Sequence, residues 1–198
     1  MKELIRLAVF AGMLIGIGGL TYLNVGGVVG ATLFAFGLMT VILCQAQLYT
    51  GKAGFLPVKQ WKRLLVILGG NAVGCALAAL MTRYAGDKLF TALDSILAAR
   101  SSASWHAILV TAIGTGAIMS LAVLGMRKGT YLPLLFGVPV FILCGLPHCV
   151  ADAFYYAVAI WDGCYEHWMW LSWLMAIIGN YIGCNLPRVM APEVFKGL

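Results

Sequence analysis

Six long apolar segments dominate the pattern of hydrophobic and polar positions along this chain. Each is close to the roughly 20 residues that an α-helix needs to cross the hydrocarbon core of a bilayer. The pattern predicts spanning segments over residues 5–23, 28–48, 62–84, 105–126, 131–159 and 167–188. Short stretches that contain Gly, Asn or charged residues separate them, at residues 24–27, 59–63, 87–102, 127–130 and 162–167.

Composition supports this interpretation. The 198 residues are 62% hydrophobic and 10% charged, and the mean hydropathy is +0.95. Soluble domains are about one quarter charged, so the chain is predicted to be an integral membrane protein. Thirteen Lys and Arg residues outnumber seven Asp and Glu residues, but the basic residues cluster in short loops. This distribution indicates membrane topology and argues against a nucleic-acid partner.

The same basic residues predict the orientation. With the N-terminus in the cytoplasm, three Lys or Arg residues lie outside, apart from Lys52 within a span. Nine lie inside: Lys2, Arg6, Lys59, Lys62, Arg63, Arg127, Lys128, Arg188 and Lys196. The excess of basic residues in cytoplasmic loops therefore places both termini inside. Lys2 and Arg6 lead directly into a full-length span without a cleavage pattern, so we expect no cleaved signal peptide.

The cysteines do not form a metal-binding or disulfide pattern. Cys164 lies in a polar loop, and the other five lie in apolar segments without C-x-x-C spacing. Cysteine in such a segment is usually a small packing residue. We therefore expect no metal site, no cofactor and no functional disulfide.

An internal repeat relates the two halves of the chain. G-N-A-V-G-C-A-L at 70–77 in the third span matches G-N-Y-I-G-C-N-L at 179–186 in the sixth. Three spans per half invert the second half relative to the first, which predicts an all-α membrane fold with repeats over 1–102 and 103–198. The G-x-x-x-G spacing favours close helix packing. Asn71 and Asn180 are amides in hydrocarbon and are therefore candidates for the transport pathway.

Polar interruptions occur at matching places in the second and fifth spans. Residues 143–153 read L-C-G-L-P-H-C-V-A-D-A, and residues 44–54 read C-Q-A-Q-L-Y-T-G-K-A-G, with 45–51 as the expected irregular stretch. Irregular backbone at membrane depth occurs only where protein or a water-filled cavity surrounds it, and Pro147 favours such a break. Each break frees a helix N-terminus that can face an anion, which predicts an anion pathway between the halves.

These motifs together resemble the formate/nitrite transporter family. The resemblance rests on G-L-M-T-V-I-L-C-Q-A-Q-L-Y-T-G at 37–51, G-L-P-H-C-V-A-D-A at 145–153 and the paired G-N-x-x-G segments, in the family's order. It implies an aquaporin-like fold with broken second and fifth helices, in a homopentamer with one pore per protomer. It also implies a prokaryotic cell (inner) membrane and passage of small monovalent anions such as formate, nitrite or hydrosulfide.

The resemblance also implies roles for individual residues. His148 matches the family's central pore histidine, and Thr50 matches the threonine that faces it from the second-span motif. Leu38 and Phe141 match the apolar constrictions on either side of the central chamber, and Phe34 is a further candidate for the pore lining.

Several positions depart from the family pattern. Tyr49 stands where phenylalanine is usual, and Arg100 falls near the place of a vestibule lysine. Gln47 replaces a common acidic residue, and Asp152 replaces asparagine. An ionised Asp152 would favour the imidazolium form of His148 and would repel an anion unless it is paired. The sequence leaves open whether Asp152 is a structural partner of the histidine or a proton relay.

We expect the anion to lose water at an apolar constriction and to meet His148, which attracts it or gives it a proton. A neutral acid crosses an apolar constriction at much lower cost than an ion, so transport should rise as pH falls.

Hydrosulfide, acetate and lactate are alternative substrates. A neutral-solute channel is a remoter alternative, because the paired N-P-A motifs are absent from the sequence. A membrane enzyme using His148 and Asp152 is disfavoured because no nucleophile accompanies them, and an accessory subunit would leave the polar breaks unexplained.

Overall fold

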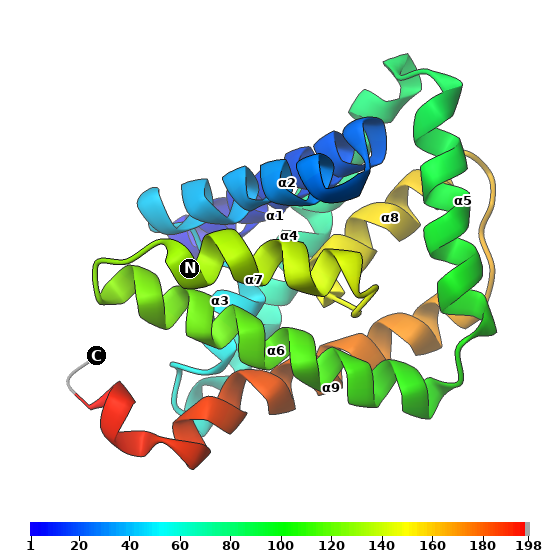
Figure 1. The fold of residues 1–198 in the computed structure, drawn as a ribbon. Helices are drawn as coiled ribbons and strands as arrows, with labels where there is room; N and C mark the ends of the chain where they lie inside the picture. The colour runs from blue at the N-terminus through cyan, green and yellow to red at the C-terminus, as the bar shows by residue number, and fades with distance from the viewer. Residues whose placement is uncertain (197–198) are drawn as a thin grey trace.

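The computed structural model of the chain describes residues 1–196, and these fold as helices joined by short loops (Figure 1). The α-helices are α1 (Lys2–Val25), α2 (Gly27–Leu43), α3 (Tyr49–Ala53), α4 (Trp61–Ala79), α5 (Asp87–Ser102), α6 (Trp105–Arg127), α7 (Leu132–Leu143), α8 (Cys149–Trp161) and α9 (Trp168–Met190). Three 3₁₀ turns accompany them: η1 (Val58–Gln60), η2 (Leu80–Tyr84) and η3 (Pro192–Phe195).

The helices confirm six spanning segments, of which the second and fifth are broken. The segments Lys2–Val25, Val58–Tyr84 and Trp105–Arg127 are each long and apolar enough to cross a bilayer unaided. The apolar helices α2, α7 and α8 are shorter. The helix pair α2 and α3 forms the second span, α7 and α8 form the fifth, and α9 forms the sixth. The N-terminus and the turn η3 lie at one end of the bundle, called the terminal face below; α5 lies at the opposite end, the α5 face (Figure 1).

Equivalent helix pairs pack against each other in the two halves of the chain. Helix α1 packs against α4 and α2 in the first half, and α6 packs against α9 and α7 in the second. The halves meet where α2 lies against α7 and where α8 lies against α4. Small residues allow the close crossings: a Cβ atom at Gly74 would collide with Val9 O, and one at Gly183 would collide with Ile113 O. Backbones that approach this closely exclude any larger side chain.

The structure differs from the sequence prediction at residues 87–102. This stretch was expected to be a connection, but it forms the 16-residue helix α5. Leu89 and Leu93 are one turn apart and both are buried, so they anchor the helix to a bundle that it contacts through α1, α8 and α9. Charged residues at Asp87, Lys88 and Asp94 obscure this apolar side when the sequence is scanned for membrane spans.

The first break is also shorter than expected. Residues 45–51 were predicted to be irregular, whereas the irregular stretch covers residues 44–48 and helix α3 begins at Tyr49. The second break covers residues 144–148 in the same way, and α8 begins at Cys149. Thr50 therefore lies in the first turn of a short helix and not in a loop.

The glycine packing predicts the effect of a single methyl group. We expect Gly74→Ala to lower the free energy of unfolding of the purified protein by roughly 1–3 kcal/mol, because the Cβ would be forced against Val9 O. Gly69→Ala is the matched control: it lies on the same helix, and a Cβ there meets nothing within 4 Å. Thermal unfolding in detergent measures both variants. Equal melting temperatures for the two variants would contradict the packing role.

Candidate functional site

The two breaks share one backbone conformation. At the first, Ala46 N donates to Val41 O at 2.9 Å; at the second, Leu146 N donates to Phe141 O at 2.9 Å. The residue before each of these donors has a positive φ, which is 51° at Gln45 and 64° at Gly145. Position 45 therefore corresponds to 145, and the positions that follow correspond in turn. Each break ends where a short helix begins, so two helix N-termini point into the protein from opposite directions (Figure 1).

Asn71 holds the first break in place. Its side-chain Oδ1 accepts a hydrogen bond from Tyr49 N at 2.8 Å. Its Nδ2 donates to Ala8 O and to Gln47 O, both at 2.8 Å. The amide is fully buried, and its hydrogen bonds all go to the backbone of α1 and of the break. Asn71 thus satisfies backbone groups that the break exposes at membrane depth.

Asn180 makes the equivalent contacts at the second break. Its Oδ1 accepts from Cys149 N at 2.8 Å, and its Nδ2 donates to Ala112 O at 2.8 Å and to Pro147 O at 3.0 Å. The two asparagines that the sequence places in the pathway are therefore clamps on the broken helices. The side-chain amides bind backbone groups only, so they act on the candidate site by positioning the backbone of the two breaks.

The cysteine of each G-N-x-x-G-C motif contacts the helix that follows the break in the other half. Cys75 Sγ donates to Val150 O at 3.3 Å, and Cys184 Sγ donates to Thr50 O at 3.3 Å. The backbone of each half-helix is thus held by an asparagine of its own half and by a cysteine of the opposite half. The two thiols make specific hydrogen bonds that the sequence did not reveal.

His148 and Thr50 meet between the two breaks. The His148 Nε2 and Thr50 Oγ1 atoms are 3.0 Å apart, and both residues are buried, at 1% and 0% exposure. His148 also caps α8, because its Nδ1 accepts a hydrogen bond from Ala151 N at 3.1 Å. A neutral imidazole that accepts at Nδ1 carries its proton on Nε2. His148 therefore donates to Thr50 Oγ1, which leaves the threonine hydroxyl hydrogen available for another acceptor.

Aromatic rings border this pair. The ring centroids of Phe141 and His148 are 5.4 Å apart, and those of Phe34 and Phe141 are 6.1 Å apart in an edge-to-face arrangement. All three rings are buried. Phe34 comes from α2 and Phe141 from the end of α7, so the two halves contribute one ring each. Tyr49 directly precedes Thr50 in the sequence, and its hydroxyl donates to Ile177 O of α9 at 3.2 Å.

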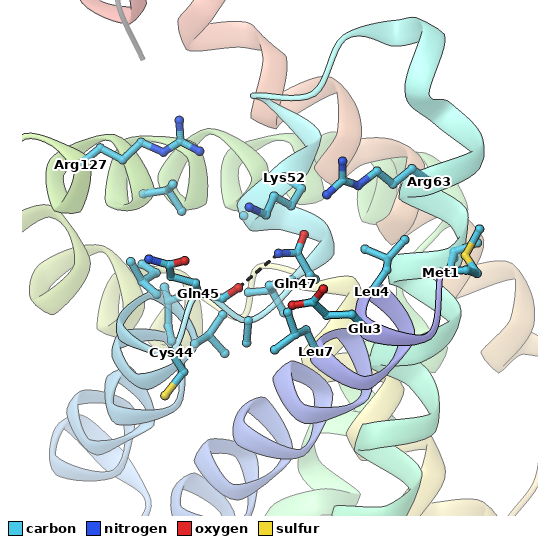
Figure 2. A pocket seen from close by; sticks show the side chains of 18 of the residues that line it. Met1, Glu3, Leu4, Leu7, Cys44, Gln45, Gln47, Lys52, Arg63 and Arg127 are labelled. Atoms are coloured by element: carbon cyan, nitrogen blue, oxygen red, sulfur yellow. Dashed lines mark hydrogen bonds between the residues drawn. The ribbon is translucent and has the colours of Figure 1, made fainter.

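A cavity of about 1080 Å³ opens at the terminal face (Figure 2). Leu38, Leu48 and Gly51 line it together with basic residues from three helices. Those basic residues are Lys52, Lys62, Arg63 and Arg127. Figure 2 shows Lys52, Arg63 and Arg127 along one side of the cavity and Glu3, Gln45 and Gln47 along the other.

Two residues of this cavity were missed as site candidates. Leu48 precedes α3 as His148 precedes α8, so an apolar side chain and an imidazole occupy equivalent positions. Lys52 lies in α3 and lines the cavity, and its charge within an apolar segment was the signal that could have identified it. Leu38 lines the same cavity, whereas Phe34 lies one turn earlier on α2, towards the α5 face.

The structure brings together two charged residues that are distant in the sequence. Arg100 Nη2 lies 3.2 Å from Asp152 Oδ1, and Arg100 Nη1 donates to Gly145 O at 2.8 Å. Both side chains are largely buried. The acidic departure from the family pattern at Asp152 is thus paired with a cation from α5.

Comparison with known proteins decides the family. The family model described as "Formate/nitrite transporter" matches residues 1–191. The chain belongs to the formate/nitrite transporter family. YrhG of Bacillus subtilis (strain 168), an uncharacterised transporter, is 26% identical over 195 residues, which cover 88% of this chain and 71% of YrhG.

Solved structures share the fold. A "pentameric formate channel with formate bound" superposes with a TM-score of 0.83 at 17% identity, and the match covers 98% of this chain and 96% of that channel. An "FNT family ion channel" superposes with a TM-score of 0.81 at 20% identity, over 100% of this chain and 90% of the other. Formate/nitrite transporters are small-anion channels or transporters and not enzymes, so the acid–base enzyme considered from the sequence is excluded.

The hydrogen bonds of Asn180 to the second break predict a loss of stability on substitution that a surface asparagine does not show. We expect Asn180→Ala to destabilise the purified protein by about 2 kcal/mol or more, because Cys149 N, Ala112 O and Pro147 O would lose their partner. Asn24→Ala is the control, since Asn24 is exposed and bonds only its own helix at Leu20 O. Thermal unfolding in detergent compares the two. An unchanged melting temperature for Asn180→Ala would exclude the clamp.

Proposed function

We propose that each protomer conducts a small monovalent anion across the membrane, with formate or nitrite as its substrate. The observation that carries this proposal is the hydrogen bond between His148 and Thr50. It joins the first turns of two inverted half-helices at the interface of the repeats. The positive ends of both helix dipoles are directed towards this pair, which favours an anion there. Family membership supports the same substrate class.

The path that we propose passes apolar constrictions on both sides of the pair. From the terminal face an anion enters the basic cavity, then passes Leu38 and Leu48, two buried residues of its lining. From the α5 face it passes Phe34 and Phe141. At each constriction the anion loses water, and between them the Thr50 hydroxyl and the backbone N–H groups of the breaks replace part of the lost hydration.

His148 gives this path its chemistry. The hydrogen on Nε2 polarises the Thr50 hydroxyl, which donates in turn to the anion. When the imidazole is protonated on both nitrogens at low pH, so that Nδ1 releases Ala151 N, its Nε2 proton passes to Thr50 Oγ1 while the hydroxyl proton passes to a formate oxygen. This transfer leaves neutral formic acid and a neutral imidazole, which takes up a new proton from water. The neutral acid crosses the next apolar constriction at lower cost than the ion. Passage is therefore coupled to a proton and is faster at low pH.

Assembly and orientation are part of the proposal. We place the terminal face in the cytoplasm of a prokaryotic cell, because nine basic residues lie there and three lie on the other side. We propose a homopentamer in the lipid bilayer with one path per protomer. The similar fold of a protein described as a pentameric formate channel supports it. Residues 1–102 and 103–198 then form the two walls of each path.

The role of His148 is tested by flux in proteoliposomes. We expect the wild-type protein to carry formate faster as external pH is lowered from about 7 to about 5, the range in which a histidine side chain ordinarily gains its proton. His148→Ala should lower formate flux by roughly tenfold or more and remove its pH dependence. A panel of nitrite, hydrosulfide, acetate, lactate and glycerol measured in the same vesicles identifies the substrate class.

His106→Ala is the matched control for this experiment. His106 is exposed at the start of α6 and stacks on Trp105, far in sequence from either break. Its flux should equal that of the wild type. A His148→Ala variant with unchanged flux and unchanged pH dependence would refute the role of His148. Glycerol permeation with no anion flux would favour the neutral-solute alternative.

The basic cavity predicts a salt-dependent effect of Lys52. We expect Lys52→Gln to raise the KM for formate presented at the terminal face by about threefold or more at low ionic strength, because the local anion concentration falls. The difference from wild type should shrink as salt screens the charge. Lys59→Gln, in the exposed turn η1, is the control. If Lys52→Gln and this control have the same KM at low salt, Lys52 does not raise the local anion concentration in the cavity.

A further inference from the structure

One buried ion pair joins the last turn of α5 to the first turn of α8, the helix that His148 caps. Arg100 Nη2 and Asp152 Oδ1 are 3.2 Å apart, with side-chain exposures of 10% and 1%. It is the single ion pair found among residues 1–196. The second oxygen of the carboxylate, Asp152 Oδ2, has no hydrogen-bond partner within the described residues, so Arg100 supplies the neutralising contact.

Arg100 contacts residues on both sides of His148 in the sequence. Asp152 follows His148 by one helical turn, and its N–H donates to His148 O at 2.8 Å. Asp152 therefore lies in the first turn of α8, the turn that His148 caps. Arg100 also donates to Gly145 O at 2.8 Å, on the other side of His148 in sequence. The guanidinium therefore connects the break to the first turn of α8.

The first half of the chain carries the opposite charge at the equivalent position. Tyr49 and Cys149 correspond as the residues whose N–H groups are bound by Asn71 and Asn180. Three residues further on, Lys52 therefore corresponds to Asp152. Lys52 lines the open cavity and makes no ion pair with a described carboxylate, whereas Asp152 is buried and paired. The charge of Lys52 is therefore available to attract anions, whereas Arg100 neutralises the charge of Asp152.

We propose that Arg100 determines the anion permeability of this protein by neutralising Asp152. This inference rests on the proposed anion-channel function. An unpaired carboxylate one helical turn from His148 would repel an anion bound there and lower its occupancy by roughly tenfold or more. Arg100 acts through Asp152 and is a positioning residue: it removes that repulsion and fixes the break at Gly145.

A double-mutant cycle separates charge cancellation from other roles of Arg100. Formate flux is measured in proteoliposomes for Arg100→Gln, Asp152→Asn and the double variant. Arg100→Gln leaves the carboxylate unpaired, and its flux should fall at least tenfold. The double variant removes both charges, and its flux should return to within about threefold of wild type. Arg83→Gln is the control, because Arg83 is an exposed basic residue of the preceding turn η2.

The outcomes distinguish this inference from its rivals. If Arg100 bound the anion directly or only braced the fold, the double variant would stay as inactive as Arg100→Gln, and that result would overturn the proposal. Wild-type flux in Arg100→Gln would overturn it as well. A wild-type protein that carries no anion in the panel would instead refute the proposed function.

Asp152→Asn alone keeps the test decisive if Arg100→Gln does not assemble. This variant retains the hydrogen bond from Arg100 to Gly145 O and leaves an uncancelled cation beside the path. Its KM for formate presented from the α5 face should fall severalfold at low salt, and the shift should diminish at high salt. An unchanged or higher KM would overturn the proposal.

Discussion

The fold depends on satisfying the backbone of two helices that are broken inside the membrane. Where a helix stops in hydrocarbon, its free N–H and C=O groups have no water to bind, and each unsatisfied group costs several kcal/mol by order of magnitude. Asn71 and Asn180 meet this requirement with one acceptor and two donor contacts each. Both asparagines reach across a helix interface, Asn71 from α4 to α1 and Asn180 from α9 to α6. The backbones of these two helix pairs must therefore approach so closely that only glycine fits at the crossings.

Much of this arrangement could be predicted from the sequence because hydrocarbon penalises polar groups so strongly. Pro147 and His148 in an apolar segment indicated a break, and the repeated G-N-x-x-G-C segments indicated two equivalent halves. The partners of these residues could not be predicted, since they depend on contacts between helices far apart in sequence. The bond from Cys75 to Val150 O and the ion pair of Arg100 with Asp152 are of this kind.

Helix α5 was missed for a different reason. A scan for membrane spans looks for apolar character on all sides, whereas α5 buries one side through Leu89 and Leu93 and exposes charges on the other. Its last turn carries Arg100. The helix predicted as a connection is thus the element that delivers the cation to the second break. Without the position of α5, the sequence left open whether Asp152 is a structural partner of His148 or a proton relay, and it did not identify Arg100 as its partner.

The two halves share a backbone but differ in chemistry, and function depends on that difference. Leu48 and His148 stand at equivalent positions, so the path has one imidazole and not two. Lys52 and Asp152 are likewise equivalent and opposite in charge. A symmetric pair of lysines would hold an anion tightly at both ends, and a symmetric pair of aspartates would exclude it. In the function that we propose, an open lysine on one side and a neutralised aspartate on the other allow an anion to enter without being trapped, since conduction requires binding that is favourable and still reversible.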